Sequence, residues 1–295
     1  MLQKIFGGTA TIVLAFVLWG ITPLFYQYLS GGDLTQILIY RVVWSVPLLL
    51  LARLLFHHRT QVRELWGDKR SFFCCMLAGL LMIVSWSSFI YALTHHQVLD
   101  ASLGYFINPL FVIALGCLFL KEKLSVFQTV AVMLGACGLI FQIISLHDVP
   151  VLPLIMGFSF ALYGLVRKFI RYDVLTSITL ETLWALPVVT IIFFATGGGS
   201  NFSTDIPHFL YFLTALVTVI PLLLFAVALN KTSLVITGLA QYIEPSLQFI
   251  IAILIFGEQI NYPELICFGA IWLGLLICVS KSFIRHGHLH GHASS

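Results

Sequence analysis

Ten apolar stretches divide the chain, and its basic residues fall into every second gap between them. The stretches are residues 5–29, 34–56, 71–94, 100–120, 124–146, 151–169, 174–197, 207–229, 232–256 and 262–284. Each is long enough to cross a hydrocarbon core, which takes about 20 residues of helix. Because the chain is 60% hydrophobic and only 9% charged, it has too little polar surface for a soluble domain. The sequence therefore predicts an all-α membrane protein with ten transmembrane helices.

The positions of the basic residues predict the orientation of these helices. Every Lys and Arg except Arg41 can be placed on one side of the membrane. The even-numbered gaps contain Arg59, Arg63, Lys69, Arg70, Lys121, Lys123, Arg167, Lys168, Arg171 and Lys231, whereas the odd-numbered gaps contain no Lys or Arg. Short basic loops stay in the cytoplasm, so we expect both termini there, with Lys4 at one end and Lys281 at the other.

The chain also repeats itself. An offset of 136 residues aligns residues 107–109 with 243–245 and residues 119–122 with 255–258. Each repeat would hold five helices, and an odd number inserts the second copy upside down relative to the first. The predicted units are a first repeat over residues 1–146, an inverted repeat over 147–285 and a His-rich cytoplasmic tail over 286–295, which we expect to be disordered. Chance similarity between leucine-rich helices is the alternative.

Three segments resemble a known family. These are residues 99–109 (LDASLGYFINP), 163–168 (YGLVRK) and 241–245 (QYIEP), which resemble the RarD group of EamA-type transporters in the drug/metabolite transporter superfamily. The resemblance runs over nearly the whole chain. It implies two inverted five-helix repeats in a bacterial inner membrane and export or exchange of small organic solutes. Chloramphenicol sensitivity is the historical label of the group, and the His-rich tail is not part of its pattern.

Charged residues at membrane depth are the first candidates for a site. Arg41, with Trp44 one turn later, aligns with Glu181 at an offset of 140 residues. A charge inside the bilayer costs about 2.5–3.5 kcal/mol unless it finds a partner or faces water. Three interpretations remain open: a structural bridge between Arg41 and Glu181, a clamp for the two charges of a zwitterion, or a Glu181 that lies near the headgroups without a partner.

The ninth stretch carries a second polar group. Gln241, Glu244 and Gln248 are spaced by three and four residues, which places them on one face of a helix. Pro245 follows Glu244 and frees a backbone carbonyl one turn earlier, so a hinge is expected there. Glu244 could bind a solute ammonium or carry a coupling proton, or it could be a hydrogen-bonded hinge residue without a transport role.

The repeat-related positions in the fourth stretch are Tyr105, Asn108 and the second predicted hinge, Pro109. Two kinked helices related by inverted symmetry meet near the bilayer midplane, where transporter sites form. Aromatic side chains would line such a site and bind planar or amphipathic solutes by stacking. The aromatic candidates are Trp86, Tyr163 and Tyr242, although aromatic residues also fill ordinary helix contacts.

Small residues four apart mark the fifth and tenth stretches: Ala131 with Gly135, and Ala270 with Gly274. This spacing lets helix backbones approach closely, so we expect these residues to pack helices rather than to bind solute. Whether the contact lies within one chain or across a homodimer is left open.

No phosphate-binding glycine loop occurs, so ATP is not expected to drive transport. We expect no enzyme activity, no cofactor and no metal site. We also expect no nucleic-acid partner, because the basic residues are dispersed over several loops. The sequence favours a secondary transporter of an amino acid or amphipathic metabolite or drug, working by alternating access, with proton coupling as an open alternative. The other function considered is a non-transporting membrane sensor or assembly module with the same fold.

Overall fold

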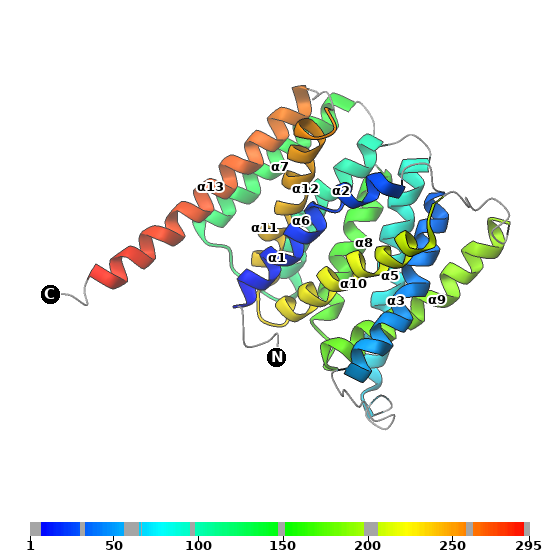
Figure 1. The fold of residues 1–295 in the computed structure, drawn as a ribbon. Coiled ribbons are helices and arrows are strands. Elements are labelled where there is room, and N and C mark those ends of the chain that lie inside the picture. Colours follow the sequence, from blue (N-terminus) through cyan, green and yellow to red (C-terminus); the bar gives the residue numbers. More distant parts are fainter. Residues whose placement is uncertain are drawn as a thin grey trace.

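The computed structural model describes residues 7–29, 33–55, 65, 67–94, 98–146, 151–197, 206–257 and 262–291. Lys4, Arg59, Arg63, Glu258 and residues 292–295 lie outside this described part. The regular elements are α1 (Gly8–Gly20), α2 (Pro23–Tyr26), the 3-10 turn η2 (Gln27–Leu29), α3 (Leu34–Leu55), α5 (Lys69–Thr94), α6 (Val98–Phe119), α7 (Val126–Leu146), α8 (Val151–Arg167), α9 (Val174–Ala195), α10 (His208–Leu229), α11 (Leu234–Gln241), α12 (Ile243–Leu254) and α13 (Tyr262–Gly291). All of these elements are helical (Figure 1).

Length and hydropathy support a membrane protein. Within the described residues, seven helical segments are long and apolar enough to cross a bilayer. They are Gly8–Leu29, Thr35–Leu55, Lys69–Phe89, Val126–Ser145, Val174–Ala195, His208–Leu229 and Leu234–Leu254, and three shorter apolar helices are Gly104–Phe119, Val151–Arg167 and Leu265–Ile277. Large apolar side chains face outward, including Leu254 and Val126 at 77% and 74% exposure, as expected for a lipid-facing surface.

Two of the ten predicted helices are broken. The first is interrupted before Pro23, where α1 gives way to α2 and η2. The ninth is interrupted at Tyr242, between α11 and α12. Pro245 has no N–H to donate to the carbonyl of Gln241, so the helix loses a hydrogen bond at the turn where it breaks. By contrast, α6 continues through Pro109.

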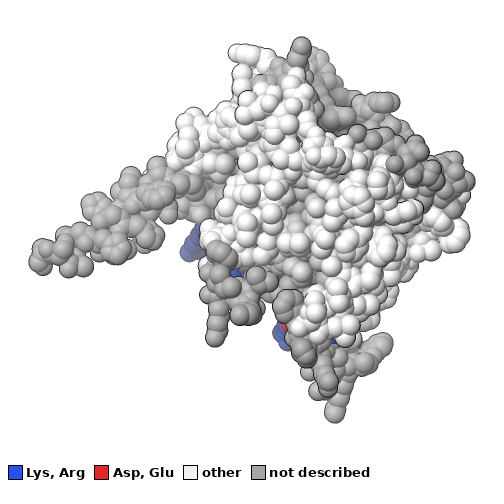
Figure 2. All heavy atoms as spheres, viewed as in Figure 1, with Lys and Arg blue, Asp and Glu red and all other residues white. Residues whose placement is uncertain are grey.

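Most of the described basic residues gather at one end of the bundle, which we call the basic end. It carries Lys69, Arg70, Lys121, Lys123, Lys168, Arg171 and Lys231, and Figure 2 shows Lys and Arg atoms on the lower side of the visible face. Several contacts tie the helix ends together here. The Glu122 carboxylate accepts hydrogen bonds of 2.8 Å from the backbone N–H groups of Leu234 and Val235, at the N-terminus of α11. The Lys168 ammonium donates to the carbonyls of Leu229 and Thr232 at the end of α10.

Helices α3 and α9, which align in the repeat, run antiparallel. At the basic end, Arg53 near the end of α3 donates to the Thr176 hydroxyl near the start of α9, at 3.3 Å. Farther along, Ile39 and Val42 of α3 pack with Val189 of α9. Residues that occupy equivalent positions in the two helices therefore lie at different heights in the bundle.

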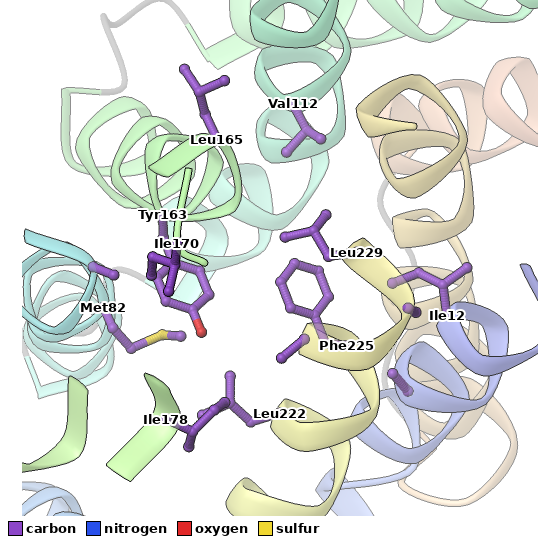
Figure 3. Close-up of a cluster of buried hydrophobic side chains, with 14 of the residues drawn as sticks. Ile12, Met82, Val112, Tyr163, Leu165, Ile170, Ile178, Leu222, Phe225 and Leu229 are labelled. Carbon is purple, nitrogen blue, oxygen red and sulfur yellow. The ribbon is translucent and has the colours of Figure 1, made fainter. Parts of the chain in front are cut away.

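A large apolar cluster joins the helices around the centre. In Figure 3, Tyr163 from α8 faces Phe225 from α10, with Ile178 and Leu222 beside them. The Tyr163 and Phe225 rings are stacked at 6.2 Å between centroids. Because Tyr163 is fully buried in this cluster, its ring position is fixed by packing and its hydroxyl is presented to neighbouring polar groups.

Helices α7 and α13 lie side by side at one flank (Figure 1). A Cβ atom on Gly274 would lie 2.9 Å from the Cα atom of Ala131, and one on Gly138 would lie 3.3 Å from the Cβ atom of Ala270. These small residues allow the two backbones to approach closely within one chain. Helix α13 extends to Gly291, into the stretch predicted as a His-rich tail.

Candidate functional site

Arg41 lies in the membrane-spanning part of α3 and has unusual partners. Its Nε atom donates a hydrogen bond to the Thr218 hydroxyl of α10. Its guanidinium carbon lies 4.3 Å from the centre of the Trp86 ring of α5, which is a cation–π geometry. Among the described residues, none accepts a hydrogen bond from the terminal nitrogens of Arg41. Arg41 therefore has a fixed position but unused donors, the arrangement that suits a bound carboxylate.

Glu244 of α12 lies in the same neighbourhood. Its helix packs against α2, which carries Tyr26, and against α6, which carries Tyr105. Arg41 is near enough to influence Glu244 electrostatically. The Glu244 Oε1 atom accepts a long hydrogen bond of 3.4 Å from the Gln248 amide. Within the described part of the chain, no ion pair joins Glu244 to Arg41. We call Arg41, Trp86, Thr218, Tyr105, Tyr26, Glu244 and Gln248 the Arg41 cluster.

Glu181 belongs to a different group of residues, nearer the basic end. Its Oε1 atom forms an ion pair with Arg167, the last residue of α8, and the side chains of Arg167 and Glu181 are only 4% and 6% exposed. The Tyr163 hydroxyl donates to Glu181 Oε2 at 3.1 Å, and Arg167 Nη2 donates to the Ser177 hydroxyl at 3.1 Å. We call these four residues the Arg167 cluster.

The predicted bridge between Arg41 and Glu181 is therefore wrong, and Glu181 is neither unpartnered nor exposed. Arg41 comes seven residues after the start of α3 at Leu34, and Glu181 comes seven residues after the start of α9 at Val174. At 1.5 Å per residue, each lies about 10 Å from its own helix start. Because the two helices are antiparallel, those starts are at opposite ends of the bundle. Equivalent positions in the repeat are thus separated along the helix axes.

A small cavity lies between the two clusters. Its volume is about 30 Å³, and its lining includes Trp86 and Thr218 from the Arg41 cluster and Glu181 from the Arg167 cluster. That volume is enough for one or two water molecules. It is too small for an organic solute, so in this conformation the cavity between the clusters has room only for water.

The remaining predicted site residues have mixed positions. Trp44 is 38% exposed and contacts Phe212, so it does not join either cluster. The side-chain oxygens of Asn108 and Gln241 and the Tyr242 hydroxyl are buried without a hydrogen-bond partner. A Cβ atom on Gly135 would lie 3.1 Å from that hydroxyl, so Tyr242 packs against α7. Within the described ranges, no group of His, Cys, Asp and Glu could hold a metal ion.

Sequence reasoning missed several members of the two clusters. Arg167 was assigned only to the basic loop, although it follows Tyr163 by four residues and therefore shares its helix face. That spacing was the available signal. Thr218 and Tyr26 gave no comparable signal, because a single hydroxyl in an apolar helix has no pattern that separates a site residue from a packing residue.

Comparison with known families identifies the fold. A model of the EamA-like transporter family matches the chain twice, over residues 7–144 and 150–280. The chain therefore contains two EamA repeats. A solved structure described only as a crystal structure of a protein has a TM-score of 0.68, is 11% identical, and aligns over 92% of this chain and 96% of that one. At this identity the likeness concerns the fold alone.

Several curated proteins are similar over nearly their whole length. Protein RarD of Escherichia coli is 34% identical over 276 residues, which are 92% of this chain and 93% of that protein. An uncharacterized transporter of Vibrio cholerae is 36% identical over 288 residues, covering 95% and 94% of the two chains. The chain therefore belongs to the EamA-like transporter family: it is a multi-pass membrane transporter that is homologous to the bacterial RarD proteins.

Proposed function

We propose that this protein is a secondary transporter that exports or exchanges a small zwitterionic organic solute, such as an amino acid, by alternating access. The single observation that carries the proposal is the relation between Arg41 and Glu244. Both residues lie in membrane-spanning helices and Arg41 acts electrostatically on Glu244, yet within the described residues no ion pair joins them. Charges at this depth are costly unless they serve a site or a partner.

The two charged groups suit the two ends of a zwitterion. The free terminal nitrogens of Arg41 could donate two parallel hydrogen bonds to a solute carboxylate. Glu244 would then accept the solute ammonium, which replaces the role that the sequence suggested for Glu181. Trp86 and Tyr105, both partly accessible, would offer aromatic surface to the rest of the solute.

The orientation follows from the basic end. We infer that this end faces the cytoplasm, because short loops rich in Lys and Arg are retained there. Both termini would then be cytoplasmic, and the second repeat, which we place at residues 147–285, would be inverted relative to the first. The antiparallel course of α3 and α9 supports that inversion. Rocking of one repeat against the other would expose the Arg41 cluster to either side.

The experiment that tests this function compares three solutes of similar shape in proteoliposomes: an amino acid, the amine without its carboxylate, and the acid without its amine. We expect counterflow of the labelled amino acid, and much weaker exchange of either single-charge analogue. Imposing a pH gradient in the same vesicles separates proton-coupled accumulation from facilitated exchange.

Matched variants make the test specific to the Arg41 cluster. Arg41→Gln and Glu244→Gln should each abolish amino-acid counterflow, whereas Trp44→Phe, outside the cluster, should leave it unchanged. If the amine or the acid exchanges as well as the amino acid, or if counterflow survives both charge-removing variants, the zwitterion proposal is wrong.

A further inference from the structure

The two arginine sites are built alike. The Arg41 guanidinium lies over the Trp86 ring at 4.3 Å and donates to the Thr218 hydroxyl. The Arg167 guanidinium lies 5.7 Å from the centre of the Tyr163 ring and donates to the Ser177 hydroxyl. In each case an aromatic face and a hydroxyl fix the guanidinium and leave it able to bind a carboxylate. The two sites differ in that Arg167 already holds one, from Glu181.

Among the described residues, Glu181 is the one that both binds Arg167 and lines the small cavity next to the Arg41 cluster. Its side chain forms an ion pair with Arg167, and the residue also lines the cavity whose lining includes Trp86 and Thr218 of the Arg41 cluster. Arg167 is the last residue of α8 and is followed by Lys168 at the basic end. A solute that leaves the Arg41 cluster toward the basic end would therefore meet Glu181 before it meets Arg167.

We propose that Arg167 is a second carboxylate-binding position of the transport path, on the basic side, and that Glu181 occupies it as an internal ligand while this side is closed. This inference rests on the proposed function, because the ligand is the carboxylate of the transported solute. In the closed state Glu181 neutralises the buried guanidinium and seals the path. When the basic side opens, the solute carboxylate replaces Glu181 on Arg167.

Tyr163 keeps a hydrogen-bonding partner beside Arg167 throughout this exchange. Its hydroxyl donates to Glu181 Oε2 at 3.1 Å and accepts from Arg167 Nη1 at 3.4 Å. Since the ring is fixed by the apolar core, the hydroxyl remains beside Arg167 when Glu181 moves away. A buried guanidinium without a counter-charge is strongly destabilising. An incoming carboxylate of the right size would therefore bind at a position whose hydrogen-bond donors are already in place.

Refilling the site with a small anion is the direct test. In Glu181→Ala the internal carboxylate is gone, and acetate should bind Arg167 in its place. We expect acetate to raise the thermal unfolding midpoint of the purified variant by about 2 °C or more over chloride at equal ionic strength, because a ligand of the folded state stabilises it. Wild type, whose Arg167 is occupied, and Glu181→Ala with Arg167→Gln should show no such difference. Equal midpoints in acetate and chloride for Glu181→Ala would overturn the proposal.

The second test measures closure and keeps the proposal falsifiable if Glu181→Ala does not fold. Cys75 is fully buried in the same apolar cluster as Tyr163, whose hydroxyl contacts Glu181 and Arg167, so its thiol reports on this region. In a chain whose other cysteines are replaced by serine, a membrane-impermeant thiol reagent is applied to inside-out vesicles. We expect Glu181→Gln, which keeps the side-chain shape, to label Cys75 about tenfold faster than its parent, because the open state gains population.

The control for the labelling test is Phe268→Ala, which weakens a separate apolar cluster without touching Arg167. It should leave the Cys75 labelling rate near that of the parent. If Glu181→Gln and Phe268→Ala accelerate labelling equally, the pair acts only through stability and the proposal fails. Neither test measures flux, so they decide whether Arg167 accepts a carboxylate in place of Glu181, whereas a failed counterflow experiment would count against the zwitterion function.

Discussion

Arg41 and Arg167 both lie in membrane-spanning helices, but the protein treats them differently. Arg167 is 4% exposed and is neutralised by Glu181, with Tyr163 and Ser177 filling further hydrogen-bonding positions. Arg41 is partly accessible, and within the described part of the chain no ion pair joins it to Glu244, which it influences electrostatically. The first arrangement satisfies a buried charge within the protein, whereas the second leaves charges that a ligand can satisfy.

The difference teaches that a charge in an apolar helix is not open to a ligand in every conformation, because the protein can supply its partner. A buried ion pair costs desolvation of both groups, and its attraction offsets that cost only when hydrogen bonds complete it. The Arg167 cluster is completed in this way and holds the conformation. The Arg41 cluster is incomplete, and the missing partner is what defines it as the candidate site.

The largest expected effect tests whether the Arg167 cluster supports the fold. Arg167→Ala leaves the Glu181 carboxylate buried without its counter-charge, so we expect the free energy of unfolding to fall by about 3–5 kcal/mol. Arg41→Ala, at a partly accessible position without an ion pair, should cost about 1 kcal/mol or less. Denaturant unfolding of both purified variants measures the two values. Similar losses would show that the clusters do not differ in the way described.

The next effect tests whether the Arg41 cluster binds the solute. In Arg41→Lys the charge remains, but the planar fork that makes two parallel hydrogen bonds to a carboxylate is lost. We expect the amino-acid affinity to weaken by about 10- to 100-fold, as the loss of a charge-assisted hydrogen bond predicts, with little change in stability. Isothermal titration measures the affinity, and the carboxylate-free amine serves as the control ligand. An unchanged affinity would remove Arg41 as the carboxylate ligand.

A third effect compares the tyrosines of the two clusters. Tyr163→Phe removes the donor to Glu181 Oε2 and leaves a buried carboxylate oxygen unsatisfied, so the free energy of unfolding should fall by about 1–3 kcal/mol. Tyr105→Phe removes a hydroxyl that has no hydrogen-bond partner among the described residues, and it should be nearly neutral. Thermal unfolding of the two variants in the same detergent gives the comparison. A larger loss of unfolding free energy for Tyr105→Phe than for Tyr163→Phe would show that the Arg41 cluster, and not the Arg167 cluster, supports the fold.

Much of the fold could be predicted from the sequence, because the bilayer demands long apolar helices and because basic loops mark one side. The EamA-type family and the two repeats were also correctly predicted, from segments that contain Asn108, Pro109 and Pro245. The sequence predicted a hinge at Pro245, whereas the helix breaks at Tyr242. The sequence identifies the residue that lacks an N–H, but not the position at which the helix ends because of it.

The candidate site was harder to predict, because it depends on which side chains face each other across helices. Arg41 and Glu181 align in the repeat, but the antiparallel course of α3 and α9 separates them along the helix axes. From the sequence, Arg167 was assigned to a basic cytoplasmic loop, because it stands next to Lys168 at the end of an apolar stretch. No sequence pattern indicates that this helix end is buried. Partners such as Thr218 come from tertiary packing alone.

The smallest expected effect concerns the two adjacent cations at the basic end, Arg167 and Lys168. Burial lowers the pKa of Lys168, whose ammonium donates to carbonyls rather than to a carboxylate. Between that lowered pKa and the ordinary value of about 10.4, the unfolded chain binds more protons than the folded chain. The free energy of unfolding should therefore rise with pH across this window. Arg167 stays protonated throughout and contributes no such rise.

Comparison of Lys168→Met with the parent tests this dependence. The parent should gain stability as the pH is raised toward about 10.4, and Lys168→Met should lack that part of the gain. Lys123→Met removes an exposed lysine of the same end and should keep the parental slope. Parallel slopes in the parent and Lys168→Met would mean that Lys168 is not desolvated. In that case a buried cation at the basic end would be tolerated only where, as at Arg167, a carboxylate neutralises it.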